Sequence, residues 1–267
     1  MPSPLATFPP LPRLALRLLP REHRKGVRAV LEYHGAVGVR LRRAFPRGAE
    51  AMQAVNAVLQ AELAPGGGTA PRTPGLAVAL AGGVPRRHLV PVVDGWNAYL
   101  LRRRPRDQAL FENTLRLLAG APARAIGGLL GLEGTESTGP VEALGMGLGM
   151  TQMLRLLGPA LHDGRLHFPE EDAERFRANL QDLADGRCTK AVQDLLWFET
   201  KRARDFLARG EQAVEAARGG PAASYLAVHL AWGRGVLDRL ESAGFDVVGR
   251  DVEMSRWEAL RLCLRRG

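Results

Sequence analysis

Residues 144–170 read LGMGLGMTQMLRLLGPALHDGRLHFPE, and this stretch decides the fold. Over residues 146–161 the apolar side chains recur at intervals of three and four, the spacing of one face of a helix. We therefore predict a buried helix here. It is expected to kink at Pro159, because proline lacks the N–H that continues helical hydrogen bonding. The helix should end near Gly164.

Three glycines lie in the first turns of this helix: Gly145, Gly147 and Gly149. A glycine inside a helix costs roughly 1 kcal/mol relative to alanine, because it loses more backbone freedom on folding. We therefore expect another part of the chain to approach the backbone closely at these positions.

The remaining pattern is also helical, without strand-like alternation or internal repeats. Residues 13–44 should form two helices that meet at Pro20. Further helices are expected over residues 49–63, 89–103, 108–118, 172–184, 187–218 and 221–243. Residues 76–81 are a short apolar stretch, residues 64–75 a Gly/Pro-rich surface loop, and residues 1–12 a flexible proline-rich arm. We interpret residues 1–267 as one all-α domain.

Four segments of the chain carry a resemblance to one known family. The residues in register are Leu18, Leu19, Pro20, Arg24, Val27, Ala29, Val30 and Tyr33, then Ala119, Gly120 and Gly131, then Leu144, Gly145, Thr151, Leu154, Arg155, Gly164, Arg165, His167 and Pro169, and finally Gly244, Asp246, Val247, Arg250, Ser255 and Leu260. In these residues the chain resembles the squalene/phytoene synthases, which join two prenyl diphosphates head to head. The resemblance implies an all-α isoprenoid-synthase fold, a helical bundle around a central cavity.

The resemblance also implies a magnesium site whose ligands this sequence lacks. In the family, magnesium ions held by two sets of aspartates on facing helices neutralise the departing diphosphate. The aspartate positions fall here on Gly38, Val39, Arg42, Leu156 and Ala160. None of these residues has a carboxylate, and magnesium takes oxygen ligands. We therefore expect no metal, no other cofactor and no catalytic residue, which favours a non-catalytic homologue in an isoprenoid or carotenoid pathway.

A shift of the alignment does not restore the metal site. Residues 31–47 contain a single acid, Glu32, and residues 146–162 contain none. Two alternatives to the non-catalytic homologue stay open. One is an active prenyl-diphosphate transferase that uses atypical residues, and the other is an all-α scaffold or assembly factor whose function has diverged.

Arginine dominates the charge of the chain. Lys and Arg number 37 and Asp and Glu number 28, which gives +9, and only three of the cations are lysines. A GC-rich coding sequence explains this bias, and an anion-binding surface is the alternative. Guanidinium groups hold diphosphates by bidentate hydrogen bonds, and Arg40, Arg42 and Arg43 lie near the first motif. If this pocket does not bind an anion, we expect these arginines to point into solvent or to pair with Glu32 and Glu50.

From these arguments we predict a metal-free site for an isoprenoid diphosphate or a lipid. The residues assigned to it are Tyr33, Arg42, Thr151, Gln152, Arg155 and Arg165. An active synthase is a further candidate partner, and no nucleic acid is expected because no DNA-binding or RNA-binding motif is present.

Composition also limits where the protein works. Cys188 and Cys263 are far apart and imply neither a disulfide framework nor a Cys-x-x-Cys site, which suits a reducing cytoplasm. The N-terminal residues do not match a signal peptide, and no window of about 18 apolar residues predicts a membrane-spanning helix. Peripheral contact with a membrane stays open as an alternative.

Overall fold

The computed structural model describes residues 15–64, 71–101, 104–162, 164–220 and 222–247, together with residues 252, 254, 255, 257, 258 and 261. The regular secondary structure of these residues is entirely helical, as the sequence predicts. The elements are η2 (Ala15–Leu18), α1 (Arg21–Ala44), η3 (Phe45–Arg47), α2 (Ala49–Leu63), α3 (Leu76–Ala81), α4 (Arg86–Leu101), α5 (Gln108–Leu115), the π-helical turn η4 (Arg116–Gly120), α6 (Ala121–Leu129), α7 (Thr135–Arg155), α8 (Leu157–His162), α9 (Glu170–Arg175), α10 (Leu180–Ala184), α11 (Lys190–Ala216) and α12 (Ala223–Ser242). The arm at residues 1–12 and residues 65–70 of the surface loop lie outside the described residues.

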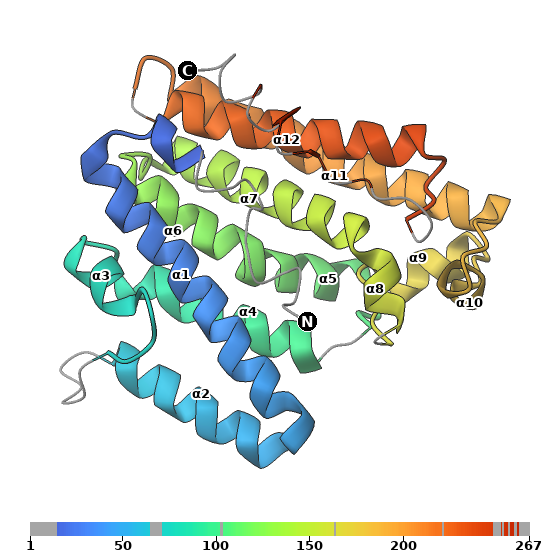
Figure 1. The fold of residues 1–267 in the computed structure, drawn as a ribbon, viewed down its shortest axis with the longest axis horizontal. Coiled ribbons are helices and arrows are strands. Elements are labelled where there is room, and N and C mark those ends of the chain that lie inside the picture. The colour runs from blue at the N-terminus through green and yellow to red at the C-terminus, as the bar shows by residue number, and fades with distance from the viewer. Residues whose placement is uncertain are drawn as a thin grey trace.

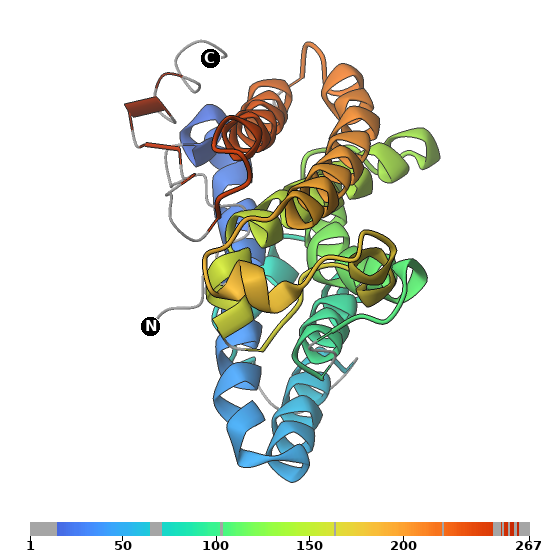
Figure 2. The ribbon, with the colours of Figure 1, turned by 90° about the vertical axis from the view of Figure 1, so that its right-hand side faces the viewer.

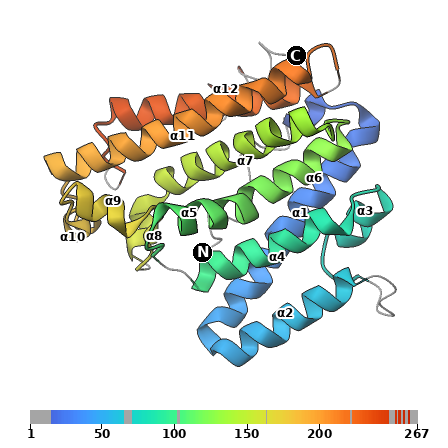
Figure 3. The same cartoon turned by 180° about the vertical axis from the view of Figure 1, so that it is seen from behind.

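Helix α7 lies at the centre of the bundle (Figure 1). Helices α11 and α12 pack on one side of it, and α6 and η4 pack on the other. Figure 3 shows α5 and α6 end to end on the opposite face of the molecule, with α4 running beside them. Helix α1 packs against α4 and α6, with α2 and α3 outside it. The short helices α8, α9 and α10 gather at the end of the bundle that faces the viewer in Figure 2.

Two glycines of α7 explain how closely its neighbours pack. A Cβ added to Gly147 would lie 2.7 Å from Cδ2 of Leu207 on α11, and one added to Gly145 would lie 2.7 Å from the carbonyl oxygen of Ala119 in η4. Both positions confirm the expected close approach to the α7 backbone. Helix α7 is therefore held between two layers at a distance that larger residues would prevent.

The helix predicted over residues 146–161 is interrupted, but at Leu156 instead of Pro159. Helix α7 ends at Arg155, Leu156 has φ −103° and ψ 15°, and α8 resumes at Leu157. Proline at position 159 cannot donate to the carbonyl of Arg155, and a proline ring crowds the carbonyl four residues earlier. The break therefore lies one turn before the proline that causes it.

Of three other predicted segments, two agree with the structure and one does not. Pro20 separates η2 from α1, as predicted, and the apolar stretch at residues 76–81 is helix α3. The prediction of one helix over residues 172–184 is wrong, because α9 and α10 are separate. Arg177 between them has φ 53°, a left-handed conformation that a right-handed helix does not contain.

No helix in the described part of the chain combines the length and the apolar character that crossing a membrane requires.

Candidate functional site

The residue at the first aspartate position, Gly38 on α1, packs against the indole of Trp96 on α4. A Cβ on Gly38 would lie 2.8 Å from Cη2 of the indole and still closer to Cε2 and Cζ2. Trp96 is fully buried, and its Nε1 donates a 3.0 Å hydrogen bond to the carbonyl of His34 on α1. The indole therefore occupies the space into which an aspartate at position 38 would extend.

Arg42 lies one turn after Gly38 and packs on the same indole. Its guanidinium carbon is 5.7 Å from the centroid of the Trp96 ring, and its Nε donates to the Gly38 carbonyl at 3.2 Å. No carboxylate among the described residues pairs with this half-buried side chain. Burial lowers the pKa of Arg42, the nearby Tyr99 raises it, and the positive charge of Arg165 lowers it. Arg42 and Arg165 are thus close enough to repel each other.

Arg165 is fixed next to Arg42 by the end of α4. Its Nη1 donates to the carbonyls of Tyr99 at 3.0 Å and Leu100 at 3.4 Å, where the last turn of a helix leaves carbonyls without helical partners. Its guanidinium carbon lies 5.1 Å from the centroid of the Tyr99 ring and 5.4 Å from that of Phe45. Two aromatic rings and a helix end therefore set the position of this cation.

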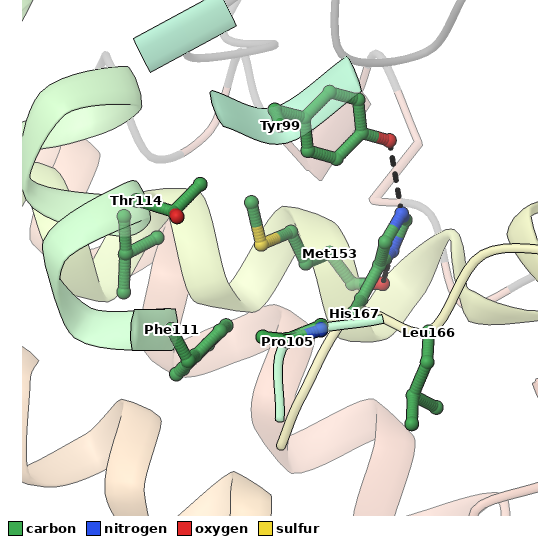
Figure 4. A pocket seen from close by; sticks show the side chains of 8 residues that line it. Tyr99, Pro105, Phe111, Thr114, Met153, Leu166 and His167 are labelled. Carbon is green, nitrogen blue, oxygen red and sulfur yellow. Dashed lines mark hydrogen bonds between the residues drawn. The ribbon is translucent and has the colours of Figure 1, made fainter. Parts of the chain in front are cut away.

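Tyr99 and His167 form a hydrogen-bonded pair, which a dashed line marks in Figure 4. The Tyr99 hydroxyl is 3.0 Å from His167 Nε2, and His167 Nδ1 is 2.9 Å from the Met153 carbonyl on α7. Burial lowers the pKa of His167 to about 4, the bond to the Met153 carbonyl opposes this shift, and Arg165 adds to it. The ring is therefore neutral at neutral pH. Its Nδ1 therefore donates a hydrogen bond to the Met153 carbonyl, and its Nε2 accepts one from the Tyr99 hydroxyl.

A small cavity adjoins this pair (Figure 4). Its volume is about 20 Å³, and it is lined by Tyr99, Pro105, Phe111, Thr114, Leu115, Met153, Leu166 and His167. A cavity of this size has room for about one water molecule. Most of its lining side chains are apolar, so a prenyl group that entered here would contact hydrocarbon after side chains had moved.

The second aspartate set is replaced by buried hydrocarbon at the break between α7 and α8. Leu156 and Ala160 are 9% and 7% exposed, and Leu156 belongs to the main hydrophobic core. The Ala160 amide donates to the Leu156 carbonyl at 3.1 Å, so the backbone there is engaged in the helix. Neither side chain offers an oxygen to a cation.

These residues do not fit the magnesium ions of the family. The positions offer hydrocarbon, a glycine and a guanidinium where a hard cation needs oxygen ligands. In the part of the chain that the structure describes, no group of three or more His, Cys, Asp or Glu side chains could hold a metal ion. The positive charge of Arg42 would also repel a divalent cation.

The other residues predicted for the ligand make hydrogen bonds within the helical bundle. Tyr33 is buried and donates to the Leu89 carbonyl at 3.4 Å, while Thr151 is buried and donates to the Gly147 carbonyl at 2.8 Å. Arg155 Nε donates to Oε1 of Gln152, one turn away on α7, at 3.1 Å.

The sequence did not determine whether Arg40 and Arg43 pair with acids or point into solvent. Arg40 contacts Glu62 at 3.3 Å and the Thr73 hydroxyl at 2.5 Å, which ties α1 to the segment after α2. Arg43 is exposed. The structure therefore brings together two of the predicted residues, Arg42 and Arg165, around Tyr99.

Sequence reasoning gave Trp96 and Tyr99 no role in the site. The signal for Trp96 was Gly38 itself, because a glycine in the middle of a long helix indicates a close neighbour. Nothing in the sequence identified which residue, on which helix, that neighbour would be.

Comparison with known proteins agrees with this fold and with the family resemblance. The family model described as squalene/phytoene synthase matches residues 13–258. A phytoene synthase of Thermus thermophilus is 29% identical over 141 residues, which cover 53% of this chain and 48% of the relative. A 15-cis-phytoene synthase of Synechococcus elongatus is 26% identical over 149 residues, which cover 49% and 46%. The chain thus matches about half the length of these curated relatives.

Two solved structures share the arrangement of helices across nearly the whole chain. A dehydrosqualene synthase in complex with a ligand superposes with a TM-score of 0.82 at 17% identity, covering 95% of this chain and 89% of that one. The squalene synthase HpnC of Alicyclobacillus acidocaldarius superposes with a TM-score of 0.76 at 19% identity, covering 87% and 88%. At such low identities this similarity establishes the all-α isoprenoid-synthase fold.

Proposed function

Because the chain belongs to the squalene/phytoene synthase family, we propose that it is a non-catalytic homologue that binds an isoprenoid diphosphate without a metal ion. The observation that carries this proposal is the pair formed by Arg42 and Arg165 beside Tyr99. Arg42 of this pair stands at a position where the resemblance to the family places a metal-binding carboxylate, and Arg165 matches an arginine of the family. The charge of the site is therefore reversed, and a diphosphate needs no metal to approach it.

The surroundings of the two arginines suit an anionic ligand. Arg42 and Arg165 repel each other, and an anion bound between them would replace that repulsion with two attractions. Each guanidinium can hold two phosphate oxygens at once. Partial burial of Arg42 against Trp96 also strengthens its electrostatic interactions relative to those of a solvated arginine.

The absence of turnover follows from the second aspartate set. Ionising an allylic diphosphate requires that the departing negative charge be neutralised, which the family achieves with magnesium. Here the second set is replaced by the hydrocarbon of Leu156 and Ala160, and Trp96 fills the space beside the first set. A diphosphate could therefore be held by arginine from one side without being released.

Calorimetric titration with farnesyl and geranylgeranyl diphosphate tests the binding. Binding is expected in excess EDTA and should be unchanged when magnesium replaces EDTA. Arg42→Ala and Arg165→Ala should each weaken it by about tenfold or more, since each removes charge-assisted hydrogen bonds. Arg43→Ala is the matched control, because it removes the same charge from an exposed neighbour on the same helix. Binding that requires magnesium would contradict the proposal.

Release of inorganic diphosphate tests the absence of catalysis. The full chain is incubated with either prenyl diphosphate and magnesium, and the released diphosphate is measured over time. We expect no release above that of a protein-free sample. Release that EDTA abolishes would instead establish an active transferase with atypical residues.

A further inference from the structure

A second and larger cavity lies at the start of α4, and it goes beyond the proposed function. Its volume is about 150 Å³, and it is lined by Arg87, His88, Arg124, Gly128, Leu132, Glu133, Thr138 and Val141. The cavity thus lies among the first turn of α4, helix α6 and the first part of α7. His88 precedes Trp96 by eight residues, which is about 12 Å along a helix, so the cavity is separate from the arginine pair.

The two arginines and the imidazole of this cavity come from two helices. Arg87 and His88 lie in the first turn of α4, whose N-terminal end carries positive partial charge, and Arg124 lies on α6. Burial lowers the pKa of His88, the charges of Arg87 and Arg124 lower it further, and Glu133 raises it. Both guanidiniums therefore lie close enough for the imidazole to sense their charges.

Two carboxylates limit this positive charge without cancelling it. Glu142 on α7 contacts Arg124 and also lies 3.0 Å from Arg116, so one carboxylate is shared between two guanidiniums. This contact holds Arg124 in place at the wall of the cavity. Glu133 is the opposing charge that lines the cavity itself, while Arg87 is exposed.

We propose that this cavity binds a phosphate-class anion through Arg87, His88 and Arg124. Thr138 also lines the cavity, but its hydroxyl donates to the Gly134 carbonyl at 2.9 Å, so the two arginines and His88 supply the contacts to the anion. A cavity of about 150 Å³ accepts a ligand as large as benzene, so a tetrahedral phosphate or a small phosphomonoester fits. Arginine is suited to this ligand because its fork of N–H groups matches the spacing of phosphate oxygens.

Titration with inorganic phosphate at constant ionic strength tests the site on the full chain. Saturable binding is expected, weakened at least about fivefold in Arg87→Ala and His88→Ala, because each loses a cationic or hydrogen-bonding contact. Glu133→Gln should tighten binding, since it removes the opposing charge. Lys190→Ala on α11 is the control for lost charge and should bind as the wild type does. Equal affinity in all four variants, or no saturable binding, would overturn the proposal.

The imidazole of His88 gives a readout at the site itself. A bound anion favours the imidazolium, so NMR titration should show the pKa of His88 rising when phosphate is present. The same rise is expected in the Arg42→Ala variant, because the two sites are separate. Phosphate binding that leaves the pKa of His88 unchanged would place the anion elsewhere and refute the assignment.

The phosphate group can come from a soluble molecule or from a lipid. Cosedimentation with phosphatidylcholine vesicles containing phosphatidic acid distinguishes these sources. Sedimentation that Arg87→Ala reduces assigns a lipid headgroup, whereas phosphate binding without sedimentation assigns a soluble ligand. Both results support the anion site, while sedimentation unaffected by Arg87→Ala in a chain that does not bind phosphate contradicts it.

Discussion

The indole of Trp96 fills the space that any side chain at position 38 would need, because a Cβ on Gly38 would overlap three atoms of its ring. Trp96 cannot easily move away, since it is fully buried and its Nε1 is bound to the His34 carbonyl. The residue with the largest side chain thus meets the residue with none. An aspartate at this position is therefore incompatible with the present packing of α1 against α4.

Gly38→Ala should destabilise the fold, although alanine is the better helix former. Overpacking against a fixed ring costs about 1–3 kcal/mol, which exceeds the gain of about 1 kcal/mol from helix propensity. Gly38→Asp should cost more, because it also places a carboxylate without a partner beside the indole. The free energy of unfolding in urea measures both effects.

Two comparisons make this prediction specific. Gly139→Ala on α7 is the matched control, because nothing lies within 4 Å of an added Cβ there, and it should be neutral or stabilising. In a Trp96→Ala background, Gly38→Ala should lose most of its cost, since the overlapping ring is gone. An equal cost in both backgrounds would mean that the indole is not what excludes a side chain at position 38.

Tyr99→Phe should destabilise the protein by about 1–2 kcal/mol, because it leaves His167 Nε2 buried without its donor. Thermal and urea unfolding measure the loss. Tyr225→Phe provides the control, since Tyr225 is a buried tyrosine whose hydroxyl has no hydrogen-bond partner among the described residues. If both substitutions cost the same, the bond between Tyr99 and His167 contributes nothing specific.

The sequence predicted the helices well because their apolar residues recur at helical spacing, which is local information. The predicted bounds of residues 49–63 agree with α2, and the glycines at 145 and 147 indicated close packing before any neighbour was known. The left-handed Arg177 between α9 and α10 has no such signal, since arginine rarely adopts that conformation. Only the surrounding structure forces it there.

The candidate site could be predicted only where it depends on residues that the sequence itself identifies. Missing aspartates are visible in the sequence, so Arg42 could be assigned from its own position. That Trp96 contacts Gly38 depends on how α1 crosses α4, and these residues are 58 positions apart. The fixing of Arg165 by the end of α4 likewise depends on tertiary packing, which helical periodicity does not specify.

Stability should fall steeply in mild acid. Burial lowers the pKa values of His34, His167 and His229 to about 4, whereas unfolded histidines titrate near 6.5. Their stabilisation is complete above pH 6.5 and is lost as the pH falls toward 4, because the unfolded chain then binds more protons. Glu199 opposes this, since burial raises its pKa to about 8 from 4.5.

The net effect in this window follows from counting protons. In the middle of the range between pH 4.5 and 6.5 the unfolded chain binds up to three more protons on the histidines, and the folded chain up to one more on Glu199. A difference of up to two protons corresponds to a slope of at most roughly 3 kcal/mol per pH unit. Urea midpoints across this range measure the slope, and the double variant His34→Gln, His229→Gln should make it shallower. A flat profile would show that these histidines are protonated in the folded state.

Glu199 itself belongs to a buried cluster on α11. Both of its carboxylate oxygens lie within 3.0 Å of Arg202 Nη1, which also binds Asp172 of α9 at 2.8 Å. Two carboxylates thus share one guanidinium. Burial raises the pKa of Glu199 to about 8, so its carboxyl is uncharged in the folded protein below that pH.

Glu199→Gln should therefore be tolerated, and its benefit should grow with pH. The contribution of Glu199 to the stability of the wild type falls as the pH rises from 4.5 to about 8, because the unfolded carboxyl ionises while the folded one does not. Glutamine does not ionise, so the free energy of unfolding of the variant should rise relative to that of the wild type across this pH range. The difference should persist at about pH 9. Asp172→Asn is the contrasting change, since it removes the charged partner of Arg202 and should destabilise at every pH in that range. Urea unfolding of the three proteins at several pH values between 4.5 and 9 measures these differences in stability. If Glu199→Gln is less stable than the wild type by the same amount at every pH, the carboxylate of Glu199 is ionised in the folded protein.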